Sequence, residues 1–447
     1  MLLTSYTALV GIMASTGFVS ADVELFVLRG LSGLVGGAMG TLVSAALSDY
    51  TPLGTRARYQ GLQGIANLLG GPIGMLGGSA LAAKGLWRWH FWGIMAPYCA
   101  INLLMAYLWC PASRPPPSGS ELLAIFKTID YVGIVSLCLA IVSFLMLGTQ
   151  AGRKWPMEDP RTIAFIILLA LSCTTFLLWG FIGNRRVRPV IPFSIFRNGT
   201  VSLVFAQQFW TGFAYSTFLL FFACYLGICY HMNSLDAAVH MLPWILVHSV
   251  WMALSGEMMS WHRPWPFARD RKISYTPMML FGFACMGVAC LILGTVRSIA
   301  GLECAQVILG LGTGSVFQNS IAVLQSHTPR EDTAVVLGTR SLVRNIGGSV
   351  GTTICSVILA QLLQGNLPSR LKALSQSAFS KPDFGAMTVG EVQGTLAAYD
   401  KGFQWVFVAC AIPMAVCFLT SFFIEDKGMM NPDIREKERR MSNEHQA

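Results

Sequence analysis

Charged residues are scarce in this chain of 447 residues. Asp, Glu, Lys and Arg make up 12% of it, about half the share of an ordinary soluble domain. A soluble protein of this length needs more charge to cover its surface, so that class is excluded. Disorder is excluded too, because hydrophobic residues reach 54% and the mean hydropathy is +0.56. The composition therefore predicts an all-α polytopic membrane protein.

The sequence also lacks the motifs of several chemistries. None of its 12 cysteines forms a CxxC pair or a zinc-type Cys/His spacing, and most lie in apolar runs, as small buried hydrophobes do. A GxxxxGK[ST] phosphate loop is missing, which excludes an ATP-driven pump within this chain. HExxH and Ser-centred elbow motifs are missing as well. We therefore predict that the protein is not an enzyme and holds no cofactor and no metal.

Basic residues outnumber acidic ones, 31 to 22, which gives a net charge of +9. They are spread over loops and the tail instead of clustering on one soluble face, so we expect no nucleic-acid partner. A lipid bilayer is the expected partner, and the basic loops are expected to orient the chain in it.

Twelve apolar runs reach the length of about 20 residues that a membrane helix needs. They are continuous instead of alternating, which argues against a β-barrel. The weakest, at 237–257, carries His240, Pro243 and His248. The runs lie at 1–20, 25–47, 60–82, 89–110, 129–148, 162–182, 202–226, 237–257, 274–296, 301–324, 334–363 and 403–424.

Lysine and arginine in the loops predict the orientation. One set of loops carries 13 of them and the opposite set ten, and the tail after residue 424 adds five to the first set. Because positive loops stay inside, we expect the first set and the C-terminus to be cytoplasmic.

Two polar linkers divide the runs into groups of four, two and six: the Pro/Ser/Gly-rich stretch after Arg114, and the basic stretch from Arg185 to Arg197. We expect an N-terminal bundle at 1–110, a cytoplasmic linker at 111–128, two additional helices at 129–182, a six-helix bundle at 183–424 and a cytoplasmic tail at 425–447.

Polar residues inside membrane spans are functional candidates. Arg29 lies one turn into an apolar helix, where a buried cation would bias the protonation of a nearby carboxylate or hold a substrate. The alternative is a snorkelling or structurally paired arginine. Gly30, Gly33, Gly36, Gly37 and Gly40 follow on the same helix, and this spacing is typical of tight helix packing.

The next helix contains the sequence GLQGIANLLGGPIGMLGG, with Gly71, Pro72 and Gly74 at its centre. Proline frees a backbone carbonyl and bends a helix, which in lipid is tolerated where neighbours satisfy the backbone again. We therefore predict a hinge at the interface between helices.

A late span carries Arg340 and Arg344, which share one helix face and either anchor the helix end or form part of a gate. Further polar residues either line a path or bond neighbouring helices: Gln207, Gln208, Gln318 and Asn319. The helix around Trp210 and Tyr215 is aromatic-rich, typical of core or lipid contact and also of a greasy cavity wall.

Together these segments resemble the major facilitator superfamily and, more narrowly, the fungal fourteen-helix drug:proton antiporters. LRGLSGLVGGAMG is similar to the arginine-bearing fourth-helix motif, with Arg29 and Gly33 in place. GIANLLGGPIGM resembles the antiporter motif on the fifth helix, with Met75 where a glycine is common. The stretches LWRWHFW, IDYVG, RRVRPVIPFSIFRNGTVS and LQSHTPREDTAVVLGTRSLVRNIGGSVG match as well.

The resemblance implies secondary active export of a small hydrophobic or cationic compound, such as a drug, toxin or fungal secondary metabolite, in exchange for protons. Arg29 would serve proton coupling, and Gly33, Gly71, Pro72 and Gly74 would shape the helix interface. We expect a monomer in the plasma membrane, with the vacuolar membrane as the second expectation.

Two alternatives stay open. One is a vacuolar transporter of basic amino acids, which would need buried acidic residues. The other is a truncated, inactive or receptor-like protein, because Met1 falls where the family's third helix begins and two earlier helices are missing from this sequence.

Overall fold

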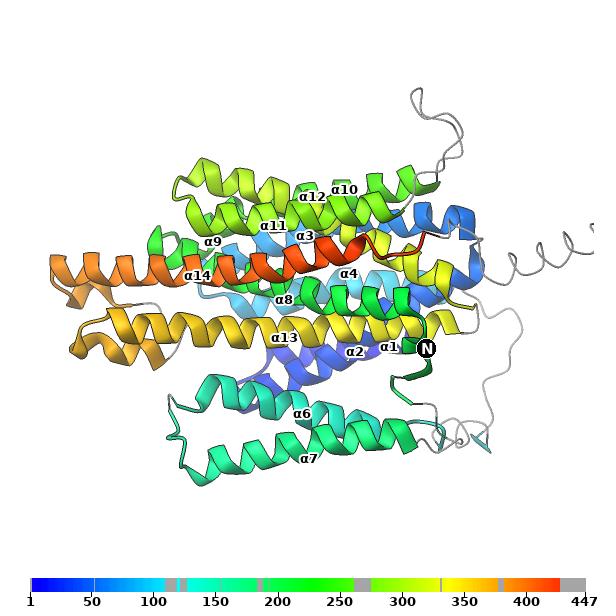
Figure 1. Ribbon diagram of the computed structural model, residues 1–447, viewed down its shortest axis with the longest axis horizontal. Helices are drawn as coiled ribbons and strands as arrows, with labels where there is room; N and C mark the ends of the chain where they lie inside the picture. Colours follow the sequence, from blue (N-terminus) through cyan, green and yellow to red (C-terminus); the bar gives the residue numbers. More distant parts are fainter. Residues whose placement is uncertain are drawn as a thin grey trace, which may run out of the picture.

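The computed structural model describes residues 2–51, 53–108, 119–120, 127–152, 154–182, 187, 189–191, 193–260, 275–329, 332–376 and 382–426. Within these ranges the chain forms long α-helices and no strand. The helices run side by side along the longest axis of the molecule (Figure 1). Most of the expected linker at 111–128 and of the tail at 425–447 lies outside the described residues.

The first four helices are α1 (Leu2–Gly17), α2 (Asp22–Tyr50), α3 (Leu53–Ala83) and α4 (Trp87–Leu108). The side chain of Asn102 on α4 donates to Thr7 Oγ1 on α1 at 2.9 Å. At the start of α4, Arg88 donates to the carbonyl of Val19 at 3.0 Å and lies over the Trp87 ring at 4.5 Å. The Trp-Arg-Trp stretch therefore fastens α4 to the loop after α1.

A pair of helices, α6 (Tyr131–Gln150) and α7 (Pro160–Ile182), forms its own layer at the edge of the molecule, next to α13 (Thr333–Asn366) (Figure 1). Asp130 caps α6 by accepting from the backbone N–H of Gly133 at 2.8 Å. Gly148 of α6 lies directly against the side chain of Thr353 on α13. The two additional helices thus contact the C-terminal group through α6.

The remaining elements form the larger part of the molecule, and each of their long helices is apolar enough to lie in a bilayer. They are η1 (Phe193–Arg197), α8 (Gly199–Cys229), α9 (Ser234–His240), α10 (Leu242–Ser260), α11 (Tyr275–Thr295), α12 (Ile299–His327), α13, η3 (Ser369–Gln376), η4 (Phe384–Ala386) and α14 (Val389–Ser421).

Ten helical stretches within the described residues are long and apolar enough to cross a membrane, which confirms the all-α membrane class. The helix α1, with 16 residues, and α2, which begins with Asp22 and Glu24, are not among the ten. The predicted run at 237–257 is interrupted at Met241, between α9 and α10. Pro243 explains the break, since it cannot donate a backbone hydrogen bond and its ring clashes with the preceding turn.

The last helix begins much earlier than predicted, at Val389 instead of residue 403. A capping box starts it: Thr388 accepts from the backbone N–H of Glu391, whose side chain accepts from the backbone N–H of Thr388 at 2.9 Å. The added turns are polar, so an apolar-window criterion does not detect them.

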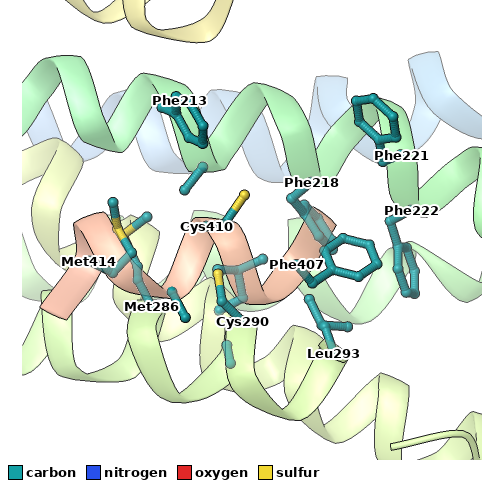
Figure 2. Packing of buried hydrophobic residues seen from close by; sticks show 14 of the residues in the cluster. Phe213, Phe218, Phe221, Phe222, Met286, Cys290, Leu293, Phe407, Cys410 and Met414 are labelled. Carbon is teal, nitrogen blue, oxygen red and sulfur yellow. The ribbon is translucent and has the colours of Figure 1, made fainter. Parts of the chain in front are cut away.

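The hydrophobic core lies among the C-terminal helices. Of the apolar stretch of α12, 78% is buried within the chain, against 0% for that of α3. Figure 2 shows α14 side chains Phe407, Cys410 and Met414 between α8 and α11, and all three are almost fully buried. The C-terminal group is therefore the part of the described chain that has a packed interior of its own.

Glycines bring α8 and α13 into backbone contact. A Cβ at Gly212 would collide with the carbonyl of Arg344, and one at Gly347 with the carbonyl of Phe209. Such contacts are what small residues permit between membrane helices. The glycines of α2 differ from this pattern: nothing lies within 4 Å of a Cβ built at Gly30, Gly33, Gly36 or Gly40. The tight packing expected for α2 is therefore not seen among the described residues, where its glycine face is open.

Candidate functional site

The molecule has two helix groups, the first four helices and the C-terminal group from α8 to α14, and they meet mainly along α3 and α10. A Cβ at Gly64 would lie 2.5 Å from the carbonyl oxygen of Ser249, and one at Gly71 would lie 2.9 Å from Cγ1 of Ile245. Pro72 lies inside α3, and a Cβ at Gly74 would meet nothing within 4 Å. Of the predicted interface residues on α3, Gly71 therefore lies at the contact and Gly74 beside it.

A cluster of aromatic and cationic side chains lies beside this contact, contributed by α8, α10, α12 and α13. We call it the aromatic–cation cluster: Tyr215, Trp244, His248, Phe317 and Arg344. The Arg344 guanidinium lies over the Phe317 ring at 4.6 Å, and that ring lies 5.0 Å from Tyr215 and 5.5 Å from His248. Trp244 covers Tyr215 and His248, each at 5.6 Å between ring centroids.

The side chains of the aromatic–cation cluster differ in how far they are exposed. Trp244 and His248 are 2% and 3% exposed, and His248 Nδ1 lies 2.9 Å from Thr313 Oγ1 on α12. Tyr215, Phe317 and Arg344 are half-buried. Since Arg344 makes no ion pair or hydrogen bond with the described residues, its cation is held only by the Phe317 ring.

One turn before Arg344, Arg340 is buried and spans the gap to α12. Its Nε donates to Ser320 Oγ at 3.0 Å, and one terminal nitrogen donates to the Phe317 carbonyl at 2.8 Å. Both acceptors are neutral, and no ion pair between described residues includes Arg340. A buried cation without a counter-ion is costly in a membrane interior, which marks this position as a functional candidate.

The predicted polar residues have different surroundings. The Gln207 amide nitrogen donates to Ser421 Oγ at 3.0 Å and to the Cys417 carbonyl at 3.2 Å, which joins α8 to α14. Asn319 donates to the Ser315 carbonyl of its own helix at 2.8 Å, and Gln318 is buried on the same helix. Gln208 is completely buried, and neither of its amide atoms has a hydrogen-bond partner among the described residues.

Gln208 lies at the same depth as Arg340. The contacts between α8 and α13 run in parallel, since Gly212 meets Arg344 and Ser216 meets Gly348. One turn earlier, this register places Gln208 at the level of Arg340. Gln208 also precedes Tyr215 by seven residues, two turns, and so shares its helix face. We call Gln208, Ser320 and Arg340 the polar layer.

A cavity of about 760 Å³ opens one turn beyond Tyr215. Leu219 and Cys224 of α8, Met75 of α3 and Met241 are among its lining residues. Its size falls within the range of small-molecule pockets, and most of its lining is apolar. On α8 the lining begins at Leu219, one turn after Tyr215 of the aromatic–cation cluster.

Arg29 lies outside this region. It is exposed on α2, with its guanidinium over the Phe91 ring of α4 at 4.7 Å, and none of the ion pairs between described residues includes it. The structure therefore brings together Arg340, Arg344 and Gln208, and leaves Arg29 and Gly33 on a separate helix.

Sequence reasoning did not single out Trp244 and Phe317, and it noted His248 only as a weakness of its span. A histidine inside an apolar run was the available signal. Among the described residues one acidic side chain is buried, Asp130, and it lies at the start of α6 instead of in the C-terminal interior.

A helical membrane fold with these motifs is found in a known superfamily. Residues 1–352 match the family model of the Major Facilitator Superfamily, and the chain belongs to that superfamily. Its fold is also similar to that of the human organic anion transporter MFSD10 (TETRAN), with a TM-score of 0.53, 13% identity, and coverage of 94% of this chain and 76% of that one.

The chain is 27% identical over 425 residues to citrate exporter 1 of Yarrowia lipolytica, covering 93% of this chain and 60% of that protein. It is 29% identical over 362 residues to the acurin A biosynthesis cluster MFS-type transporter of Aspergillus aculeatus, covering 79% and 60% respectively. The chain thus spans 60% of the length of these two relatives.

Proposed function

We propose that this protein is a secondary active transporter that exports a small organic molecule in exchange for protons. The observation that carries the proposal is the aromatic–cation cluster, built from four helices and placed beside the contact between α3 and α10. Cations inside a membrane are expensive, so keeping two arginines there favours a role in binding or coupling. The relative named citrate exporter 1 supports an export direction.

The mechanism we propose is alternating access by rocking of the two helix groups. At the α3–α10 contact Gly64 lies against the α10 backbone and Gly71 against the Ile245 side chain, so α3 presents no side chain at these two positions. The helices can shift or part there without unlocking side chains of α3. The half-buried face of Tyr215, Phe317 and Arg344 would then open alternately to the two sides of the membrane.

The vacuolar basic amino acid alternative is less well supported. Recognition of a cationic side chain would need a carboxylate in the interior. Among the described residues the buried acid is Asp130, whose oxygens already accept three hydrogen bonds outside the cluster. For an exporter we propose the plasma membrane, which a fluorescent fusion would test.

The test is transport by the purified chain in liposomes that contain the pH dye pyranine. We expect addition of a transported compound to move protons across the membrane, and citrate and the cationic dye rhodamine 6G are the first probes. Arg29→Ala should abolish this coupled flux while Arg29→Lys retains part of it, because the proposed coupling role depends on the positive charge. Both variants should reach the membrane in normal amounts.

If neither probe elicits proton flux and neither labelled probe shows counterflow, the result supports the inactive or receptor-like alternative. Normal flux in Arg29→Ala would contradict the coupling role of Arg29 and leave the rest of the proposal standing.

A further inference from the structure

We propose that the polar layer and Arg344 form a binding site for the carboxylate of an amphipathic organic anion, with the apolar body of that anion against Tyr215 and Phe317. The inference rests on the proposed transport function and names the substrate class of its site. Four observations carry it: two cations without an acidic partner and a buried amide without a hydrogen-bond partner among the described residues, an aromatic wall, and a cavity that begins one turn beyond Tyr215.

The positive charges of Arg340 and Arg344 favour an anionic ligand. Arg340 and Arg344 lie one turn apart on α13, and no acidic side chain pairs with either among the described residues. Arg340 uses its Nε and one terminal nitrogen on neutral oxygens, which leaves several of its five N–H donors available. Guanidinium groups match the geometry of a carboxylate, so a ligand of that class would complete the site.

Gln208 provides an independent sign of a missing ligand. Buried polar groups are nearly always hydrogen-bonded, yet both amide atoms of this fully buried side chain lack a partner within the described part of the chain. Its register places it at the level of Arg340 and on the face of α8 that carries Tyr215. The Gln208 amide nitrogen would donate to the same carboxylate that the arginines attract.

The remainder of the site is apolar. Phe317 and Tyr215 present half-buried rings beside Arg344, and Leu219 continues the same face of α8 into the cavity of about 760 Å³. A ligand with its charge at Arg344 and its hydrocarbon part toward Leu219 would satisfy both regions. A small inorganic anion would leave the aromatic wall and the cavity without a partner.

If the polar residues served only to stabilise the fold, their substitution would lower the melting temperature. The adjacent Gln207 and Gln208 distinguish this structural role from a role in anion binding. Gln207 is hydrogen-bonded to α14, whereas Gln208 has no hydrogen bond with the described residues that a substitution would remove. Gln208→Leu should therefore keep or raise the melting temperature and still weaken anion binding. Gln207→Leu should lower the melting temperature and leave anion affinity unchanged, because it removes helix bonds away from the site.

The experiment is calorimetric titration of the chain in lipid nanodiscs with 1-naphthoate and with its neutral analogue 1-naphthamide, against empty nanodiscs. We expect naphthoate to bind more tightly than naphthamide. Arg344→Gln should weaken naphthoate binding by about tenfold or more, since it removes a charge-assisted contact, and leave naphthamide binding unchanged. Arg344→Lys should recover part of the loss, and the exposed Arg370→Gln should have no effect.

Equal binding of the two probes, or none, overturns the proposal, as does unchanged naphthoate affinity in both Arg344→Gln and Gln208→Leu. These outcomes are separate from the proton-flux test. If the chain shows coupled proton flux but naphthoate binding does not behave as expected, only the assigned anion site is contradicted. If naphthoate binding behaves as expected but the chain transports no substrate, only the transport function is contradicted.

Discussion

One carboxylate, Asp130, joins three separate segments. Its Oδ1 accepts from the backbone N–H of Gly133 and from the indole N–H of Trp179, each at 2.8 Å, and its Oδ2 accepts from the backbone N–H of Val190 at 3.1 Å. The start of α6, the end of α7 and the segment before η1 therefore meet at this side chain. A Cβ at Gly133 would collide with the carboxylate, which explains the glycine in the IDYVG stretch.

Asp130→Ala should destabilise the protein by roughly 3 kcal/mol, because it leaves buried donors without an acceptor and removes a helix cap. Asp130→Asn keeps one acceptor oxygen and should cost less. The measurement is the melting temperature in detergent, with the exposed Asp236→Ala as the matched control. A melting temperature for Asp130→Ala equal to that of the control would show that these bonds contribute nothing.

For individual side chains, the sequence indicates the polar positions but not their partners. Asp130 belonged to a recognised stretch, yet Trp179 and Val190 are 49 and 60 residues away, and nothing local indicates that they meet it. Gln207 and Gln208 look equivalent in the sequence. Only tertiary packing separates them, since a step of about 100° around α8 turns one toward α14 and the other toward the α12 and α13 side.

Among the helices, the α3–α10 contact is the feature most sensitive to side-chain volume. Three of the glycines of α3 differ in what they face: backbone atoms at Gly64, the Ile245 side chain at Gly71 and open space at Gly74. A backbone atom cannot move aside, whereas a side chain can change its rotamer. The same substitution should therefore have graded effects along one helix.

We predict that Gly64→Ala lowers the melting temperature and the transport rate most, that Gly71→Ala has a smaller effect, and that Gly74→Ala is neutral or stabilising. Alanine gains roughly 1 kcal/mol over glycine in helix propensity, and overpacking at a tight contact costs about 1–3 kcal/mol. Thermal unfolding and flux of the three variants, measured together, test the order. A loss at Gly74 as large as that at Gly64 would contradict it.

Helix existence could be predicted from apolar runs, and helix ends could not. The run at 403–424 marks the apolar part of α14, but the helix starts at Val389, where polar residues are stabilised by partners elsewhere. One of them, Asp400, pairs with Arg297 at 2.9 Å and accepts from the Tyr225 hydroxyl at 3.1 Å. Composition identifies the segments that are apolar enough to enter lipid. Pairs of polar side chains such as Asp400 and Arg297 depend on the tertiary structure.

Across the whole molecule, composition was sufficient for the membrane class, and the motifs for the superfamily. The location of the charged site was not predictable in the same way. The arginine that the resemblance emphasised, Arg29, is exposed on α2, while the buried Arg340 and the half-buried Arg344 lie on α13. Which arginines face an interior depends on how the two helix groups meet, and that arrangement is a property of the assembled helices.

Rocking of the two groups requires the α3–α10 contact to change, and a covalent bond across it tests this directly. The Cβ position at Gly71 lies 2.9 Å from Cγ1 of Ile245, which sets the two Cβ atoms roughly 4–4.5 Å apart, within disulfide range. We predict that the double variant Gly71→Cys, Ile245→Cys forms a disulfide on oxidation, loses transport, and recovers it on reduction.

The chain's own cysteines make controls necessary, so the wild type, each single variant and the pair Gly74→Cys, Ile245→Cys should be oxidised in parallel. Peptide mapping should find the cross-link only in the first pair, because Gly74 lies beside the contact. If the cross-link forms and transport continues at the same rate, the two groups do not move apart along α3 and α10. Alternating access would then have to be achieved by bending within α3 or α10, for which Pro72 and the break at Met241 are the available positions.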